Sequence, residues 1–108
     1  MSLESEFTIE LLKSEDRFLG WRIECQQALA IFGSRFLDQE AASTIFGLKH
    51  INFLKQCHSN NVLEYGGISI DADAHWTDRP GIALGVYTAD CLPIVLISNS
   101  ERLVAIIH

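Results

Sequence analysis

One thiol and two imidazoles stand where separate apolar runs of the chain end. Cys91 follows one run, His58 follows another, and His108 closes a third, at intervals of 33 residues (58 to 91) and 17 residues (91 to 108). These intervals are too long for a zinc finger or ribbon, but they suit ligands from separate strands meeting at one edge of a sheet. Three ligands of mixed N and S type with a fourth position open is the arrangement of a catalytic zinc. The spacing therefore predicts a metal site at His58, Cys91 and His108.

The same side chains admit other chemistry. Cys91 with His58 or His108 could form a thiolate–imidazole nucleophile pair. Asp73 and Asp90 could act as a general acid and base. Each of these residues also has a plain structural interpretation, because free cysteines are often buried and aspartates often lie in turns.

The expected elements that would position these groups are short strands. Residues 81–87 and 94–97 are apolar and rich in β-branched side chains, the pattern of strands buried on both faces. Further strands are expected at 51–56, 62–65 and 103–107, with a hairpin connection at 98–102. Turns are expected at 58–61, 66–67 and 78–81. No element is assigned to the polar, mixed stretch 71–77, and His50 and His75 are expected to face solvent.

The first third of the chain supplies one firm helix. Residues 39–46 are good helix formers, Asp38 is a suitable N-cap, and Gly47 stands at the C′ position. Before it we expect an edge strand at 7–12 and a charged loop at 13–20, whereas the apolar residues of 25–36 fit either a helix or a buried strand. Together these elements predict an α/β or α+β fold, with a mixed sheet and flanking helices.

Composition limits the classes of function. The 108 residues suffice for a single domain, and 48% hydrophobic against 20% charged content is typical of a globular chain. A net charge of −6 argues against nucleic acid and against an anionic membrane surface. No run is long and apolar enough to span a membrane, and no basic signal sequence opens the chain, so a cytoplasmic protein with free thiols is expected.

Several motifs follow one another in a distinctive order. They are Leu-Lys-Gln-Cys-His-Ser-Asn-Asn-Val at 54–62, Ala-Asp-Ala at 72–74, Pro-Gly-Ile-Ala-Leu-Gly-Val at 80–86, Thr-Ala-Asp-Cys-Leu-Pro at 88–93 and Val-Ala-Ile-Ile-His at 104–108. This series resembles the multicopper polyphenol oxidoreductase or laccase-domain family, also described as purine nucleoside phosphorylases and including the peptidoglycan editing factor. The resemblance covers residues 48–108 well and the first half poorly.

The resemblance implies a zinc held by His58, Cys91 and His108, with Asp90 close to the metal. By the same resemblance, Gln56 and Asp73 shape the site and are candidate contacts for the substrate. It also implies phosphorolysis of purine nucleosides such as adenosine, inosine and methylthioadenosine, and adenosine deamination. A purine nucleoside and phosphate would then be the partners. Arg35 resembles an early arginine that follows a strand in the family, so the resemblance implies a strand at 27–32. Arg35 is also the candidate contact for the anion.

The chain departs from the family pattern in ways that keep alternatives open. Members continue past the histidine at 108 with an Ala-Gly-Trp-Arg-Gly block, so residues 1–108 are expected to be the N-terminal portion of a larger laccase-type domain. They also carry a longer glycine-rich loop after Arg35, and valine where Cys57 stands. A copper-dependent polyphenol oxidase stays open, since Cu²⁺ binds such sites tightly. So does a non-catalytic metal-binding remnant that forms a homodimer through its exposed half-core.

Overall fold

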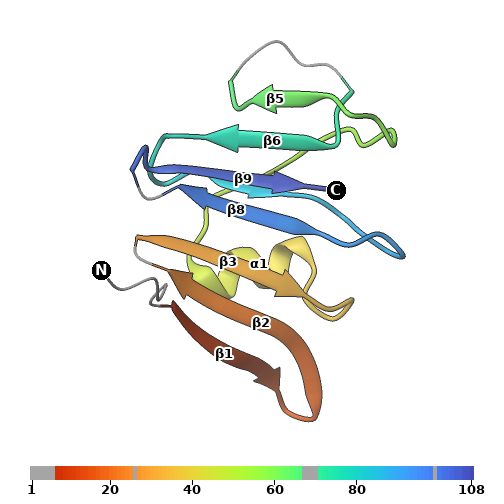
Figure 1. Cartoon of the computed structure of the whole chain (residues 1–108). Helices are drawn as coiled ribbons and strands as arrows, with labels where there is room; N and C mark the ends of the chain where they lie inside the picture. The colour runs from red at the N-terminus through yellow and green to blue at the C-terminus, as the bar shows by residue number, and fades with distance from the viewer. Residues whose placement is uncertain (1–6, 26, 67–70, 99) are drawn as a thin grey trace. The chain divides into compact units, whose positions relative to one another are not determined.

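The chain forms two compact units, Met1–Gly47 and Leu48–His108. The computed structural model describes residues 7–25, 27–66, 71–98 and 100–108, and Figure 1 traces their strands and helix. Within these residues three sheets, with parallel and antiparallel pairs, accompany a single helix. The predicted α/β class with mixed strand pairing is therefore confirmed.

The sheet of the first unit is a three-stranded antiparallel meander. Its strands are β1 (Phe7–Ser14), β2 (Arg17–Cys25) and β3 (Ala28–Gly33), in the order β1-β2-β3. The strand expected at 27–32 is confirmed, but the loop expected at 13–20 is wrong. Only Glu15 and Asp16 separate β1 from β2, and Glu15 adopts a positive φ of 55°. The charged residues of 13–20 lie in the exposed ends of β1 and β2 and in the tight turn between them. Such a segment has the same composition as a loop.

Helix α1 (Gln39–Phe46) has the predicted bounds and caps. The Asp38 side chain accepts a hydrogen bond of 2.8 Å from the backbone N–H of Ala41. Gly47 is left-handed, with φ 65°, and its N–H donates to the carbonyl of Ser43. Both ends are therefore capped as the residue types predict. In the described part of the chain, no helix is long and apolar enough to cross a membrane.

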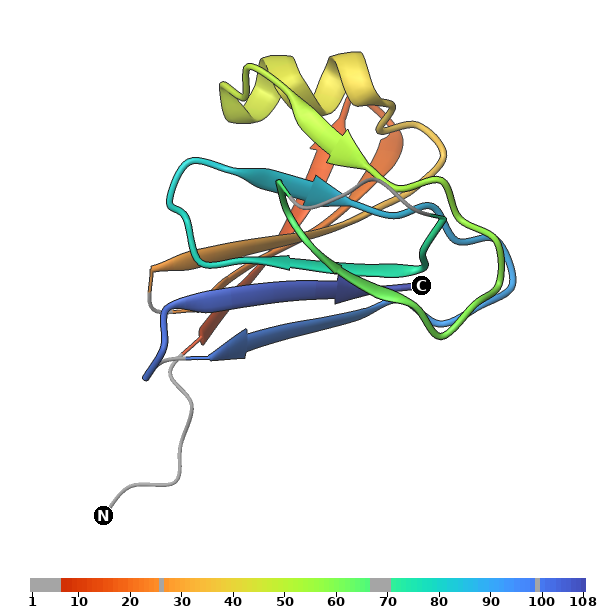
Figure 2. The same ribbon diagram turned by 90° about the horizontal axis from the view of Figure 1, so that it is seen from above.

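The second unit contains two sheets. Strand β4 (Ile51–Phe53) pairs in parallel with β7 (Ala83–Gly85). The other sheet has the order β5-β6-β9-β8, with a parallel β5–β6 pair and antiparallel β6–β9 and β8–β9 pairs. Its strands are β5 (Val62–Glu64), β6 (Ala74–Thr77), β8 (Ile94–Ser98) and β9 (Leu103–Ile107). Figure 2 shows β4 and β7 running side by side toward the edge where β9 ends.

Strand β6 is the central strand that the sequence pattern did not predict. His75 and Thr77 of this strand and Asp73 just before it are all buried, each 3% exposed, and so are Ala72 and Ala74. His75 was expected to face solvent, and that prediction is wrong: its Nε2 lies 3.2 Å from the carbonyl oxygen of Gly85. Loss of hydration lowers the pKa of His75, so the buried ring is neutral. The sequence pattern did not predict the strand because its buried side chains are polar and find hydrogen-bond partners inside the protein.

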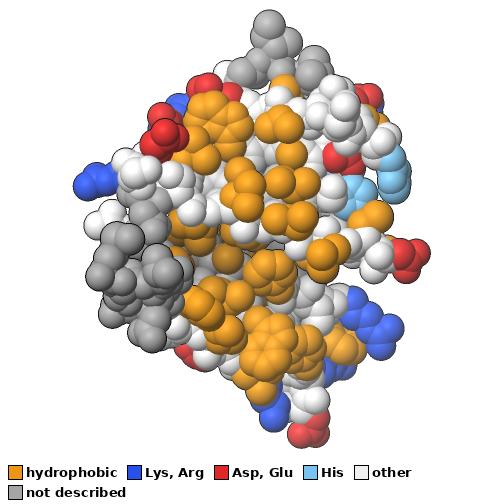
Figure 3. Space-filling view, in the orientation of Figure 1, with side chains coloured by type: hydrophobic (Ala, Val, Ile, Leu, Met, Phe, Trp, Pro, Cys, Tyr) orange, Lys and Arg blue, Asp and Glu red, His pale blue; other side chains and the backbone are white. Residues whose placement is uncertain are grey.

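Strand β8 is only half covered in the described part of the unit. Ile94 is 43% exposed and Leu96 is 52% exposed, while Val95 and Ile97 between them are partly buried. The prediction that residues 94–97 are buried on both faces is therefore wrong. Alternate residues of a strand point to opposite faces, so the face with Ile94 and Leu96 is more open than the face with Val95 and Ile97. Figure 3 shows hydrophobic side chains gathered over this sheet on the face in view.

The predicted turns are partly outside the described residues. Gly66, with φ 88°, follows β5, whereas Gly67 lies outside the described residues. The connection at 98–102 joins β8 to β9 as predicted, and its Asn99 also lies outside them.

Candidate metal centre

The loop after β4 carries His58 and is held by one carboxylate. His58 has a positive φ of 59°, a conformation that non-glycine residues seldom adopt. On either side of it, the backbone N–H groups of Cys57 and Ser59 donate to Oδ1 of Asp73, at 3.0 and 2.9 Å. The Ser59 hydroxyl donates to the same oxygen at 3.1 Å, and the Cys57 thiol lies 3.6 Å from it. Backbone N–H groups that converge on an anion in this way fix the left-handed residue between them.

The second oxygen of the same carboxylate holds His108. Oδ2 of Asp73 lies 2.6 Å from Nδ1 of His108, and the two side chains are 4% and 9% exposed. The hydrogen bonds from Ser59, His108 and Cys57 lower the pKa of Asp73, so the carboxylate is ionised. An ionised carboxylate can only accept, so Nδ1 of His108 carries the hydrogen. In the neutral ring Nε2 then has its lone pair free for a metal.

The two imidazoles lie next to each other. The ring centroids of His58 and His108 are 5.2 Å apart, with the ring planes at 69°. Figure 3 shows histidine side chains at the edge of the sheet where β9 ends. A carboxylate on one ring nitrogen of a metal-binding histidine, orienting the other toward the metal, is the usual outer support of such a ligand. The donor set and its orientation therefore fit a zinc ion.

Cys91 and Asp90 lie in the loop between β7 and β8, and both are exposed. Across the residues that the structure describes, no three His, Cys, Asp or Glu side chains are already grouped to hold a metal ion. The structure thus brings two of the three predicted ligands together, and Cys91 as the third stays a prediction. So does a role for Asp90 beside the metal. An ionised Asp73 has no proton to give, so it could not be the acid of an Asp73–Asp90 pair, and the pairing itself stays a prediction.

Gln56 and Asp73 were both predicted to shape the site. Asp73 does so by joining His108 to the loop of His58. The side chain of Gln56 bonds to the backbone of Tyr87: its Nε2 donates to the carbonyl oxygen and its Oε1 accepts from the N–H, both at 2.7 Å. A contact from Gln56 to substrate stays a prediction.

Arg35 belongs to the first unit. It is exposed, and its guanidinium lies 4.9 Å from the centroid of the Phe36 ring, while that of Arg17 lies 5.1 Å from the same ring. Two cations therefore flank one phenyl ring, an arrangement compatible with an anion contact. That role for Arg35 stays a prediction.

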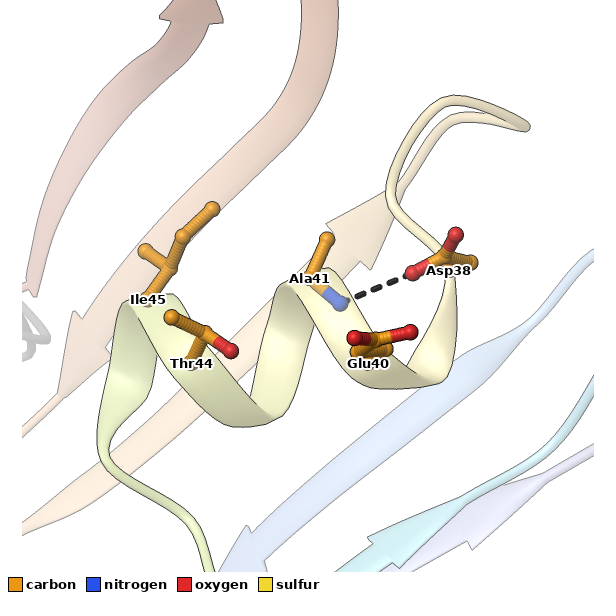
Figure 4. A pocket seen from close by; sticks show the side chains of 5 residues that line it. All are labelled: Asp38, Glu40, Ala41, Thr44 and Ile45. Carbon is orange, nitrogen blue, oxygen red and sulfur yellow. Dashed lines mark hydrogen bonds between the residues drawn. The ribbon is translucent and has the colours of Figure 1, made fainter.

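A surface depression lies on α1, and none of the residues that line it belongs to the predicted site. Figure 4 shows its lining. The residues are Asp38, Glu40, Ala41, Thr44 and Ile45. Its two carboxylates would repel an anionic substrate, and none of its residues was a predicted ligand.

Two groups that hold the Asp73 carboxylate were not predicted from the sequence. Ser59 and the backbone of Cys57 supply the donors that fix Asp73, yet serine and asparagine after His58 indicated only a turn. The available signal was an Asp inside a segment that is otherwise small and apolar, at 72–74. A lone acid at a buried position needs donors, and the only nearby polar loop in the motif series is 57–61.

Comparison with known proteins confirms the resemblance that the motifs indicate. The chain is 37% identical over 65 residues to a purine nucleoside phosphorylase of Clostridium acetobutylicum, covering 58% of this chain and 28% of that protein. It is 41% identical over 58 residues to a purine nucleoside phosphorylase of Haemophilus influenzae, covering 52% and 24%. The chain thus spans about a quarter of the length of these curated relatives.

A solved structure and a family model agree with these relatives. The crystal structure of a Neisseria meningitidis protein, NMB0706, matches with a TM-score of 0.54 and 36% identity, covering 64% of this chain and 29% of that one. The model for the family described as multi-copper polyphenol oxidoreductase laccase matches residues 37–108. Since that match extends over more than half of the sequence, the chain belongs to the multi-copper polyphenol oxidoreductase laccase family.

Proposed function

We propose that this chain carries the zinc-binding part of a purine nucleoside phosphorylase, with His58, Cys91 and His108 as the ligands. The observation that supports this most is the pair of adjacent imidazoles, 5.2 Å apart, with His108 oriented by an ionised Asp73. Relatives named purine nucleoside phosphorylase supply the substrate class. Because the chain spans only about a quarter of those relatives, the whole reaction is part of the proposal.

Each residue has a defined part in this proposal. Asp73 keeps the hydrogen of His108 on Nδ1, which leaves Nε2 as the metal donor. The same carboxylate holds the backbone of Cys57 and Ser59, so that His58 between them presents its ring to that of His108. Cys91, in an exposed loop, supplies the sulfur. A zinc ion held by two nitrogens and one sulfur would act as a Lewis acid toward an oxygen of water or substrate in its open position.

The substrates are a purine nucleoside and phosphate. Phosphorolysis transfers the ribosyl group from the base to phosphate, and it requires an anion contact and stabilisation of positive charge on the sugar. Arg35 is the residue we propose for the anion contact. Deamination of adenosine is the second reaction proposed for the same metal centre, because attack of an activated water on a purine carbon needs the same Lewis acid.

Metal analysis of the purified chain tests the ligand set. We expect about one zinc per chain in the wild type, and a substantial loss of zinc in Cys91→Ala, because three protein ligands hold a catalytic zinc. Cys25→Ala is the matched control, since Cys25 is a second free thiol, in the other unit, and should retain full zinc. Equal metal content in wild type and Cys91→Ala would remove the sulfur ligand from the proposal.

An adenosine assay with and without phosphate tests the reaction. Release of adenine that requires phosphate supports phosphorolysis, and release of inosine without phosphate supports deamination. Oxidation of a phenol after copper loading, with neither nucleoside reaction, would instead support a polyphenol oxidase. Zinc binding with no turnover of any of these substrates would point to a metal-binding part that does not act alone.

A further inference from the structure

A side chain extends the pairing of the two strands that lead into the proposed metal centre. Strands β4 and β7 are paired through their backbones only as far as Phe53 and Gly85. Tyr87 lies two residues beyond Gly85. Its backbone N–H and carbonyl both bond to the side-chain amide of Gln56, with two hydrogen bonds of 2.7 Å. An amide side chain offers an N–H donor and a carbonyl acceptor side by side, so it can bond to a peptide backbone as another strand would. Gln56 therefore continues the two-stranded pairing where the strand backbones have already separated.

Aromatic packing reinforces this attachment. The rings of Phe53 and Tyr87 are stacked, with centroids 4.4 Å apart and an interplanar angle of 12°. The Phe53 ring occupies the space beside Gly85, where a Cβ would stand 2.6 Å from it. Tyr87 is thus held at its backbone by Gln56 and at its ring by Phe53, immediately before the loop that carries Cys91.

Both residues of this contact lie close in sequence to proposed metal ligands. Gln56 stands two residues before His58, and Tyr87 stands four residues before Cys91. Asp73 already fixes His58 and His108 relative to each other. The Gln56–Tyr87 bonds join the thiol-bearing loop to that assembly.

We propose that Gln56 is a positioning residue of the metal centre: it holds the loop of Cys91 against the loop of His58, so that the thiol meets the two imidazoles when zinc binds. This rests on the proposed ligand set. Because both hydrogen bonds go to the backbone of Tyr87, this role of Gln56 acts through the loop and is not a contact with the metal. Holding the loop before the metal arrives lowers the conformational entropy lost on binding.

Replacing Gln56 tests this role against a matched control in the same strand pair. In Gln56→Ala we expect zinc affinity, measured by competition with a chelator in the full chain, to fall about tenfold, the lower range for loss of a group that supports a ligand. Gln56→Met, which keeps the length of the side chain but neither bond, should behave alike. Asn52→Ala is the control: its amide also joins β4 to β7, through one bond of 2.9 Å to the carbonyl of Ala83, at the end away from the ligands. It should leave zinc affinity unchanged.

Two further readouts separate a positioning role from a loss of folding. Hydrogen exchange at the Tyr87 amide should be about fivefold faster or more in Gln56→Ala, because one hydrogen bond contributes about 1 kcal/mol, which is that factor. Zinc should protect Cys91 from alkylation in the wild type and in Asn52→Ala, and less in Gln56→Ala, as followed by mass spectrometry of its peptide. Unfolding curves of the two alanine variants show whether stability is affected equally.

The outcomes distinguish this proposal from the one it rests on. If zinc does not protect Cys91 in the wild type, the ligand set fails and the positioning role fails with it. If zinc protects Cys91 in the wild type and Gln56→Ala binds zinc as tightly as Asn52→Ala does, the ligand set stands and the role of Gln56 is overturned. Equal losses of affinity in both variants would show a general effect of weakening the strand pair, which also overturns it.

Discussion

The two units of the chain build their sheets by different means. In the first unit β1, β2 and β3 follow one another in sequence and pair as antiparallel neighbours. In the second unit β4 pairs with β7 and β6 with β9, so that each pair closes a long stretch of chain. The buried polar side chains of the described residues, Asp73, His75 and Thr77, all belong to the second unit.

This difference shows which kind of sheet can bring functional side chains from distant parts of the chain together. A meander of neighbouring strands brings together residues of adjoining strands, and its side-chain contacts here include the cap of α1, the Arg22–Glu24 pair and a bond from the Ser34 hydroxyl to the carbonyl of Phe18. Distant strands that end at one edge bring together residues from separate loops, as they do for His58, Asp73 and His108. Such a cluster needs internal donors for its carboxylate, and the second unit supplies them.

The largest expected effect comes from removing the charge at the centre of this cluster. Asp73→Asn keeps the shape of the side chain but replaces one acceptor oxygen with a donor NH₂. We expect zinc affinity to fall by up to about 100-fold, because His108 and the 57–59 loop lose their common anchor. A chelator competition measures this.

Asp71→Asn is the control for that substitution. Asp71 is exposed and two residues away, and it contributes its backbone carbonyl to Asn61. We expect it to bind zinc as the wild type does. Amide exchange should become faster in the 57–61 loop of Asp73→Asn and stay unchanged in β1, β2 and β3. Unaltered zinc affinity in Asp73→Asn would contradict the orienting role of the carboxylate.

The pH dependence of stability should also separate the units. All four histidines of the sequence, at 50, 58, 75 and 108, lie in the second unit. Burial lowers the pKa of His75 in the folded state. Below about pH 6.5 the unfolded chain binds a proton at this ring that the folded chain does not. Stability therefore falls as the pH is lowered through that value, by at most about 1.4 kcal/mol per pH unit for one proton.

His75→Gln isolates this contribution. Glutamine retains a donor for the carbonyl of Gly85 but does not titrate. Urea unfolding at pH 7.5 and pH 5.5 should show a smaller loss of stability on acidification in the variant than in the wild type. An equal loss in both would mean that another group titrates in this range and that His75 does not.

The smallest expected effect lies in the first unit. Asp38→Ala removes the side chain that caps α1 and should cost about 1 kcal/mol of stability. Asp38→Asn, which can still accept from the N–H of Ala41, should cost much less. Thermal unfolding measures both, and zinc affinity should be unchanged in each. A change in zinc affinity on removing this cap would break the assignment of the metal centre to the second unit alone.

Local signals predicted the elements that are set by neighbouring residues. The bounds of α1 followed from Asp38 and Gly47, and β8 and β9 followed from apolar runs. The apolar run of β3 fitted a helix equally well, and the family resemblance favoured the strand. Strand β6 was missed because its buried positions His75 and Thr77 are polar. His75 lies against the carbonyl of Gly85 in β7, and Thr77 accepts from the N–H of Arg79. The hairpin of β1 and β2 was missed because a charged exposed strand has the composition of a loop.

The site was predictable only in part for the same reason. Ligand types and strand ends indicated His58 and His108, and the structure places their rings together. The hydrogen bonds that hold them come from Asp73 to a loop 14 to 16 residues earlier in the chain and to a residue 35 positions later. No periodicity or turn pattern encodes contacts of that kind.

The attachment of Gln56 to Tyr87 has one consequence for how this protein can diverge. Its hydrogen bonds reach only peptide atoms, which every residue except proline provides in full, and the Tyr87 side chain is 57% exposed. Substitutions at 87 can therefore alter the outer surface while both hydrogen bonds to the main chain persist, with loss of the ring that stacks on Phe53. A substitution at 56 removes both hydrogen bonds at once.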